Sequence, residues 1–91
     1  MCGILGELLF NSNKLTDKGQ FISLLNLSNN RGPDAQGYYS NSENMQFGFN
    51  RLSVLDLSDN ANQPIQSSSG RYMMIFNGEI YNHLELRKSL P

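Results

Sequence analysis

The 91-residue sequence has very little cysteine, and that scarcity excludes several classes of protein. Its one cysteine, Cys2, cannot form an internal disulfide, which favours a reducing compartment over a secreted, disulfide-stabilised scaffold. No apolar run approaches the ~20 residues that a membrane-spanning helix needs. The sequence also lacks the basic and apolar regions of a secretory signal. We therefore expect a cytoplasmic protein without a membrane partner.

Charge of either sign is scarce as well. Seven lysines and arginines, scattered along the chain, oppose eight aspartates and glutamates, which gives a net charge of −1. A nucleic-acid-binding surface shows a basic excess, so we expect no nucleic-acid partner. The histidine, cysteine and carboxylate residues lack the spacing of metal ligands, so no metal is expected.

The pattern of apolar residues predicts a mixture of strands and helices. Residues 2–10 and 71–76 carry apolar side chains at both even and odd positions, which indicates strands buried on both faces. Between them, an amphipathic helix is expected to follow Thr16 as N-cap and to end near Asn29 and Asn30. Its inner face has the spacing of a helix and consists of Phe21, Leu24, Leu25 and Ser28.

A β-hairpin is predicted in the middle of the chain. Met45, Phe47 and Phe49 alternate with polar or small residues, and turn-forming residues precede them at 41–44. Arg51 continues the apolar side of this alternation. A buried arginine needs an anionic partner, so Arg51 is a candidate ligand-binding residue.

The last third of the chain is predicted to hold a strand at 52–57 and a long polar loop or loose hairpin at 58–70. Asn82, with Glu85 three residues later, has the pattern of a helix N-cap and its return partner. The sequence given ends at Pro91, about two turns into that helix.

Strands with two apolar faces need covering layers that a chain of this length barely supplies. We therefore interpret residues 1–91 as the N-terminal part of a larger domain. Uncovered strand edges pair readily with other chains, so a homo-oligomer is also expected.

The position of Cys2 suggests a catalytic role. Methionine aminopeptidases remove an initiator methionine when the next side chain is small, and Cys2 would then carry a thiol and a free α-amine. An α-amine titrates near pH ~8 and a thiol near ~8.5. A nucleophile and a weak base on one residue are the minimum for acyl transfer. The alternative is that Cys2 is a small buried residue at the start of a strand.

Four segments, in order and at similar spacing, resemble the glutamine-hydrolysing asparagine synthetase family of class II glutamine amidotransferases. They are Met1-Cys2-Gly3-Ile4-Leu5-Gly6, Arg31-Gly32-Pro33-Asp34, Arg51-Leu52-Ser53-Val54-Leu55-Asp56 and Asn77-Gly78-Glu79-Ile80-Tyr81-Asn82. The second and fourth segments favour asparagine synthetases over other amidotransferases. The sequence departs from the family at Asn30, where histidine is common, and at Phe49 and Asn50, where basic residues or histidine are frequent.

The resemblance implies an α+β fold, the αββα sandwich of N-terminal-nucleophile hydrolases, with two antiparallel sheets between helix layers. The N-terminal half of that sandwich would be present here. It also implies an enzyme, in which Cys2 attacks the side-chain amide of L-glutamine, forms a glutamyl thioester and releases ammonia for synthesis of asparagine or a related amide. The glutaminase domain would need no cofactor, whereas ATP and Mg²⁺ belong to a synthetase domain absent from these residues. Residues 1–91 alone are expected to be inactive.

The resemblance also assigns roles to residues of the later segments. The Asn77 amide and the Gly78 N–H would bind the oxyanion that forms on the attacked carbonyl. Arg51 would hold the glutamine α-carboxylate through two parallel hydrogen bonds, and Glu79 would face the α-ammonium group. The alternatives are a simple hairpin turn at Asn77-Gly78, a surface arginine and a solvated turn carboxylate.

Three further residues have supporting roles in this interpretation. Arg31 and Asp34 would order the loop near the nucleophile, and Gly32 would allow an unusual backbone conformation. His83, the one histidine, is an alternative base for Cys2. Because the family uses the terminal amine as base, we interpret His83 as structural.

Two other functions are consistent with the sequence. A regulatory or binding module would retain Met1 and hold glutamine without hydrolysing it, because an acylated amine cannot act as a base. A truncated, non-catalytic fragment would contribute at most glutamine binding or assembly.

Overall fold

A computed structural model describes residues 2–11, 14–52 and 62–91, in which short strands and helices alternate. The strands are β1 (Gly3–Leu8), β2 (Ala35–Ser40), β3 (Met45–Arg51), β4 (Ile65–Gln66) and β5 (Met73–Met74). The helices are α1 (Lys18–Asn26), the 3-10 helix η1 (Asn29–Arg31) and α2 (His83–Lys88). Apart from Leu52, the strand predicted at 52–57 lies outside the described residues, as does the first part of the loop predicted at 58–70.

The central strand β3 organises an antiparallel sheet with the order β1-β3-β2. The predicted hairpin is confirmed, because β2 and β3 pair across residues 41–44. In that loop the Asn41 side-chain oxygen accepts hydrogen bonds from three successive backbone N–H groups, those of residues 43 to 45. Every residue of β3 after Met45 is buried, so the sheet is covered on both sides along its centre.

Helix α1 starts one residue later than the sequence predicts. Asp17, and not Thr16, is the N-cap: its carboxylate accepts hydrogen bonds from the backbone N–H groups of Gly19 and Gln20. The Thr16 hydroxyl instead donates to Glu7 of β1 at 2.8 Å. Thr16 therefore links the segment before α1 to the sheet, and the Asp17 carboxylate caps the helix instead.

The inner face of α1 packs on the sheet through Phe21 and Leu25, which are 2% and 0% exposed. Leu24, also predicted to be in the core, is half exposed. A Cβ atom on Gly48 of β3 would lie 2.5 Å from a Leu25 methyl carbon, so the glycine allows the helix to approach closely. The helix ends at Asn26, and η1 occupies the remainder of the predicted helical segment.

A buried polar connection joins the end of α1 to β3. Asn50, fully buried, donates to the Leu25 carbonyl at 2.8 Å and to the Ser28 hydroxyl at 2.9 Å. Its side-chain oxygen accepts a hydrogen bond from Gln36 of β2 at 2.9 Å. All of its polar atoms thus have partners, so this buried amide fixes the position of the helix end relative to the sheet.

The second strand pair is shorter than predicted. β4 and β5 form an antiparallel pair of two residues each. This short hairpin spans residues 65–74, so only β4 and the turn lie within the segment predicted as a polar loop or loose hairpin. The strand predicted at 71–76 contracts to Met73–Met74. The reason is that a strand extends only as far as its hydrogen-bonded partner, and β4 offers two residues.

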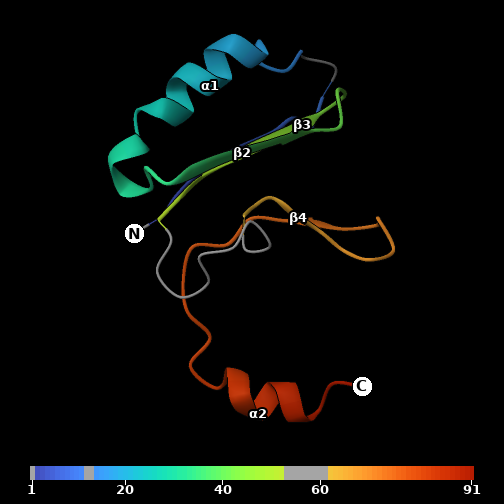
Figure 1. Cartoon of the computed structure of the whole chain (residues 1–91). Helices are drawn as coiled ribbons and strands as arrows, with labels where there is room; N and C mark the ends of the chain where they lie inside the picture. The colour runs from blue at the N-terminus through green and yellow to red at the C-terminus, as the bar shows by residue number, and fades with distance from the viewer. Residues whose placement is uncertain (1, 12–13, 53–61) are drawn as a thin grey trace.

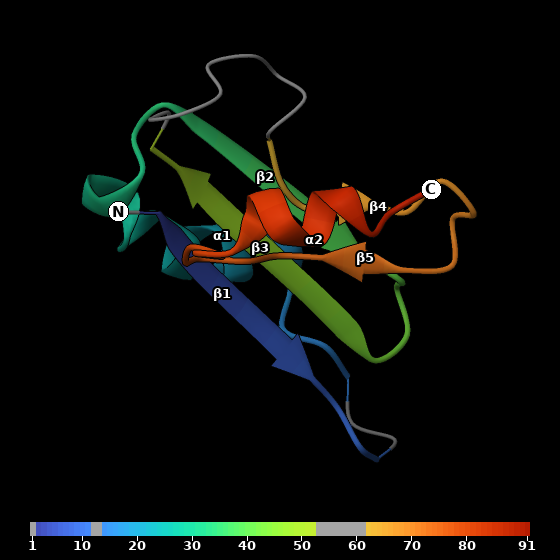
Figure 2. The ribbon, with the colours of Figure 1, turned by 90° about the horizontal axis from the view of Figure 1, so that it is seen from below.

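Figure 1 shows how these elements are layered, with α1 on one face of the three-stranded sheet, the β4–β5 hairpin on the other, and α2 beyond the hairpin. In Figure 2, α2 and the hairpin lie in front of the sheet and α1 lies behind it. The result is a mixed α/β structure with antiparallel sheets, in agreement with the predicted class.

Helix α2 begins where the sequence predicts but without the predicted capping hydrogen bonds. Asn82 is the N-cap residue, and its side chain makes no capping hydrogen bond. Its φ of −100° and ψ of 31° differ from the extended geometry that directs an N-cap side chain toward the first turn. The reciprocal capping box predicted from Asn82 and Glu85 is therefore not formed.

The face of the sheet opposite α1 is incompletely covered. Ile4 and Leu8 of β1 are 48% and 53% exposed, so the prediction that β1 is buried on both faces is wrong for this chain. The accessible surface is 7071 Å², against about 5,400 Å² for a compact monomer of this mass. The radius of gyration, 14.7 Å, likewise exceeds the ~12 Å typical of 91 residues. The chain therefore leaves apolar surface that another layer can cover.

Glu7 connects β1 to the approach of α1 and makes the fold sensitive to acid. Its carboxylate accepts hydrogen bonds from the Gln46 amide at 2.7 Å, the Thr16 hydroxyl at 2.8 Å and the Thr16 backbone N–H at 3.0 Å. The bond from Gln46, followed by those from Thr16, lowers the pKa of Glu7 below its usual 4.5. A depressed carboxyl pKa stabilises the fold above the unfolded value, and this contribution disappears as pH falls through the folded pKa.

We therefore expect the free energy of unfolding to fall as the pH drops below about 4.5, with the Glu7→Gln variant showing a shallower fall. The variant should also be less stable than wild type at neutral pH, because it loses the charge-assisted hydrogen bonds. Urea unfolding from about pH 3 to about pH 7 measures both effects. Glu43→Gln, in the exposed β2–β3 loop, is the matched control. An unchanged slope in Glu7→Gln would contradict the assignment.

Candidate active site

The structure brings the four motif segments together around Cys2. Its thiol contacts the backbone of Leu52, and its carbonyl contacts the side chains of Arg31 and Asn77. These partners lie 50, 29 and 75 positions away in the chain. One residue at the start of β1 thus contacts a member of every other segment.

The Cys2 thiol lies against the end of β3. Its Sγ atom accepts a hydrogen bond from the Leu52 N–H at 3.3 Å and points its own hydrogen toward the Leu52 carbonyl at 3.8 Å. The side chain is partly exposed, so it is neither the fully buried residue of the alternative reading nor a free surface thiol. Backbone groups of Leu52 therefore hold the sulfur in place at the end of β3.

The Cys2 carbonyl is held by two side chains. Arg31 Nε donates to it at 3.2 Å from η1, and Asn77 Nδ2 donates to it at 3.0 Å from the segment after β5. The two donors come from segments 46 residues apart in the chain, and both hold the backbone of the cysteine. Arg31 therefore lies where the sequence interpretation placed it, beside the candidate nucleophile.

Gly32 is required for close packing and not for an unusual backbone angle. Its φ of −154° lies outside the left-handed region, so that part of the prediction is wrong. A Cβ atom at this position would lie 2.1 Å from the Asn50 carbonyl oxygen and 2.7 Å from the Arg51 carbonyl carbon. The next residues continue the contact, because the Asp34 N–H donates to the Arg51 carbonyl at 2.9 Å. The Arg31–Asp34 segment is therefore packed against the end of β3.

Arg51 is buried, with 5% of its surface exposed. It shares a face of β3 with Phe47 and Phe49, as the alternation of the sequence predicts. Its NH1 group donates to the Asn62 side-chain oxygen at 2.6 Å. A surface arginine at a strand end is thus excluded, and Arg51 directly precedes Leu52, whose backbone contacts the thiol.

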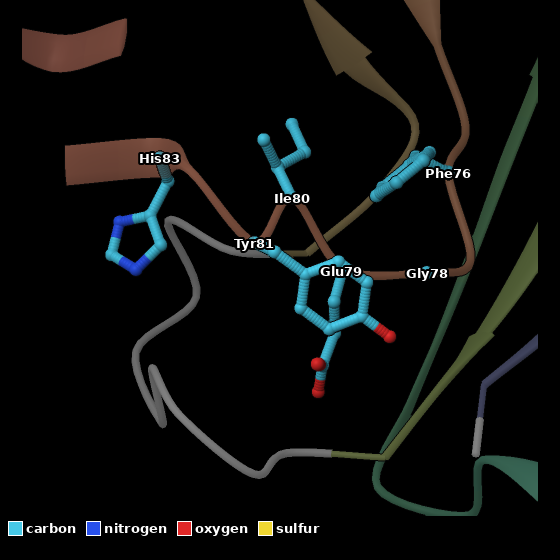
Figure 3. Close-up of a pocket in the computed structure, with 6 residues that line it drawn as sticks. All are labelled: Phe76, Gly78, Glu79, Ile80, Tyr81 and His83. Atoms are coloured by element: carbon cyan, nitrogen blue, oxygen red, sulfur yellow. The ribbon is translucent and has the colours of Figure 1, made fainter. Parts of the chain in front are cut away.

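A hollow of about 460 Å³ lies along the segment that follows Asn77. Its described lining consists of Phe76, Gly78, Glu79, Ile80, Tyr81 and His83. Figure 3 shows the Glu79 carboxylate and the His83 imidazole on one side of this segment and the Ile80 side chain on the other. The volume falls within the range of small-molecule sites. Glu79 therefore combines a carboxylate with access to a cavity next to Asn77.

Asn77 and Gly78 do not form a hairpin turn. The chain bends at Gly78 and continues through a turn into α2, with no strand after it among residues 78–91. The simple-turn alternative for this pair is therefore wrong. What positions the bend is Gln63, whose side chain bonds both backbone groups of Phe76. Sequence reasoning missed Gln63 and Asn62, because single amides in a polar loop carry no periodic signal.

In the part of the chain that the structure describes, no helix is long and apolar enough to cross a membrane. Across residues 2–11, 14–52 and 62–91, no group of three histidine, cysteine, aspartate or glutamate side chains could hold a metal ion.

Comparison with known proteins identifies the family. The glutamine amidotransferase domain family matches residues 1–91, the whole of the chain. The chain belongs to this family. Its motifs were predicted to be those of the glutamine-hydrolysing asparagine synthetases, and that prediction is confirmed by the relatives it matches.

Three of these relatives illustrate the similarity. The chain is 43% identical to glutamine-hydrolyzing asparagine synthetase 1 of Bacillus subtilis over 94 residues, which cover 99% of the chain and 14% of that protein. It is 37% identical to the glutamine-hydrolyzing asparagine synthetase of Brassica oleracea over 90 residues, covering 99% and 15%. It is 43% identical to a putative asparagine synthetase of Mycobacterium tuberculosis H37Rv over 72 residues, covering 70% and 11%. No solved structure matches the chain.

Proposed function

We propose that this chain supplies the nucleophile and the oxyanion site of a glutaminase, which hydrolyses L-glutamine and provides ammonia for amide synthesis. The observation that carries the proposal is the convergence of Arg31, Leu52 and Asn77 on Cys2. Membership of the glutamine amidotransferase domain family supplies the substrate class.

Removal of Met1 is the first step of the proposal. It frees the α-amine of Cys2, which takes the thiol proton as the sulfur attacks the amide carbon of glutamine. The C–S bond forms and the carbonyl becomes an oxyanion. When the oxyanion collapses, the C–N bond breaks, and the ammonium group of Cys2 returns the proton to the departing nitrogen. Water then attacks the thioester and releases glutamate, which restores the thiol.

Asn77 and Gly78 are proposed to bind the oxyanion. The Asn77 amide has two hydrogens, so the bond to the Cys2 carbonyl leaves one hydrogen for the reacting oxygen. The Gly78 N–H belongs to the same bend and follows Asn77 directly. Donors held in place before reaction stabilise the developing charge without reorganisation.

Arg51 and Glu79 are proposed to bind the two α-substituents of glutamine. Arg51 offers a planar, permanently charged group on a buried strand, which suits a carboxylate. Glu79 lines the hollow beyond the bend, where a carboxylate can meet the α-ammonium group.

The ammonia is proposed to serve synthesis of asparagine or a related amide, since the relatives named above are asparagine synthetases. That synthesis uses ATP and Mg²⁺, and no residue of this chain is assigned to it. The chain spans 14% and 15% of the length of two of these relatives.

We also propose that the uncovered face of β1 belongs to a four-layer αββα sandwich, with further chain or a second copy over Ile4 and Leu8. Residues 1–91 by themselves would then associate, which sedimentation would detect as a dimer or larger species. They would also lack glutaminase activity, because the thiol is held by too little surrounding structure.

Two substitutions in the full-length protein separate binding from chemistry. Arg51→Ala should mainly raise the KM for glutamine, because its contact with the carboxylate exists before and during attack. Asn77→Ala should mainly lower kcat, by about 10²–10³, because its hydrogen bond is needed most in the transition state. Steady-state ammonia release measures both constants. Equal kinetic signatures for the two variants would contradict these roles.

A further inference from the structure

Gln63 occupies a position that the proposed catalytic roles do not explain. It lies between Asn62, which bonds Arg51, and Pro64, which precedes β4. The residue is partly buried, and its side chain reaches across to residue 76, 13 positions away.

The Gln63 amide binds both backbone groups of one residue. Its Oε1 atom accepts a hydrogen bond from the Phe76 N–H at 2.5 Å, and its Nε2 atom donates to the Phe76 carbonyl at 3.2 Å. A primary amide presents one acceptor and one donor side, which match the N–H and C=O of an extended residue. The side chain thus substitutes for a neighbouring strand just where β5 has ended.

Fixing Phe76 also fixes the start of the oxyanion bend. The Phe76 carbonyl belongs to the planar peptide unit that includes the Asn77 nitrogen and Cα atoms. The hydrogen bond from Gln63 Nε2 to that carbonyl restricts rotation of the peptide plane. Because the Asn77 Cα atom lies in this plane, the orientation of the Asn77 side chain and of the Gly78 peptide is restricted as well. The direction of both proposed oxyanion donors therefore depends on the amide of Gln63.

The backbone of Gln63 is itself anchored to the sheet. A Cβ atom on Gly37 of β2 would lie 1.7 Å from the Gln63 carbonyl oxygen and 2.9 Å from Pro64 Cδ. Only a glycine permits this approach, so Gln63 is pressed directly on the strand. Gln63 therefore connects the three-stranded sheet to the bend. The Asn77 side chain in turn connects the bend to the Cys2 carbonyl.

We propose that Gln63 is a positioning residue that orients Asn77 and Gly78 for stabilisation of the oxyanion. This inference rests on the proposed glutaminase function. A split between kcat and KM distinguishes this role from one that only stabilises the fold. Misdirected oxyanion donors lower kcat, while substrate binding through Arg51 persists and KM changes little.

The test uses Gln63→Met in the full-length protein, with Met1 removed. Methionine keeps the length and unbranched shape of glutamine but loses both hydrogen bonds. We expect kcat for glutamine hydrolysis to fall about tenfold or more, below the ~10²–10³ of a deleted donor, with KM changed less than threefold. Gln63→Asn, one methylene shorter, should also lower kcat, because it cannot reach both groups of Phe76.

Gln66→Ala is the matched control. This residue lies in β4, and its side-chain amide donates to the Gly70 carbonyl at 3.5 Å, away from the bend. Its kcat and KM should equal those of wild type. Thermal unfolding of all variants verifies that the folded protein is being assayed.

Three results would overturn the inference. Wild-type kcat in Gln63→Met, or a fall that Gln66→Ala reproduces, would show that the amide does not orient the donors. A rise in KM with unchanged kcat would assign Gln63 to binding instead. A parallel Cys2→Ala assay distinguishes failure of the proposed function from failure of this inference. If hydrolysis survives in Cys2→Ala, the proposed function fails. If hydrolysis is lost in Cys2→Ala but Gln63→Met keeps the wild-type kcat, only this inference fails.

Discussion

Replacing Cys2 with alanine in the full-length protein is expected to lower glutamine hydrolysis by about 10⁴-fold or more, because no other group can form the thioester. Synthesis from free ammonia should continue, since that reaction bypasses the thiol. The measurement is ammonia and glutamate release from glutamine, together with acid quenching of wild type to detect a glutamyl group on the N-terminal peptide. Undiminished hydrolysis in Cys2→Ala would defeat the assignment.

A second form of the protein tests the base in the same experiment. An uncleaved residue before Cys2 keeps the thiol but converts the α-amine to an amide, which cannot accept a proton. This form should be as inactive as Cys2→Ala. Full activity in the extended form would exclude the terminal amine as base and favour the alternative dyad with His83.

Substituting Gly32 with alanine is expected to disrupt the packing of the Arg31–Asp34 segment against the end of β3. The new Cβ would lie 2.1 Å from the Asn50 oxygen and 2.3 Å from its carbonyl carbon, both of them backbone atoms that cannot rotate away. We expect a loss of stability of about 1–3 kcal/mol. Glutamine hydrolysis should fall as well, because the segment that carries Arg31 must move from the end of β3. Urea unfolding and kinetic assays measure the two effects.

Gly6→Ala is the control for this prediction. A Cβ at Gly6 of β1 would meet only the Phe47 Cβ at 3.8 Å, an ordinary contact. Replacing a strand glycine under such conditions changes stability by about 1 kcal/mol or less, and in the stabilising direction. If Gly32→Ala and Gly6→Ala were tolerated equally, close packing at Gly32 would not be the reason for the glycine.

The local patterns of the sequence were sufficient to predict part of the fold. The alternation through Phe47 and Phe49 predicted the β2–β3 hairpin and correctly placed Arg51 on the same buried face. Asn82 likewise marked the start of α2. These features depend on neighbouring residues, whose periodicity is visible in one dimension.

Features that depend on distant partners were not predictable in the same way. The strand at 71–76 has the composition of a long strand, yet its length is set by the two residues of β4. Thr16 has the chemistry of an N-cap, but Glu7 of β1 engages its hydroxyl, and Asp17 caps the helix. A glycine before a proline suggests an unusual backbone conformation, but Gly32 is needed because the Asn50 carbonyl of β3 leaves no room for a Cβ atom.

The candidate site shows both situations. Its residues were selected by their resemblance to a family, and their convergence on Cys2 followed from the fold. The catalytic roles of Cys2, Arg51, Asn77, Gly78 and Glu79 remain predictions. The role proposed for Gln63 could not be read from the sequence, because a single amide in a polar loop shows no periodicity and its partner, Phe76, lies beyond β5.

The wide separation of the residues around Cys2 has a consequence for folding. The β2–β3 hairpin closes a loop of only a few residues, whereas the contact between Cys2 and Asn77 closes one of 75. The difference in loop-closure entropy is roughly 2–3 kcal/mol in favour of the hairpin. The hairpin therefore forms early, and the contact with Asn77 forms after the intervening chain is arranged. A partly folded chain thus carries its thiol before Asn77 reaches it, so we expect the proposed glutaminase activity to be among the last properties acquired on folding.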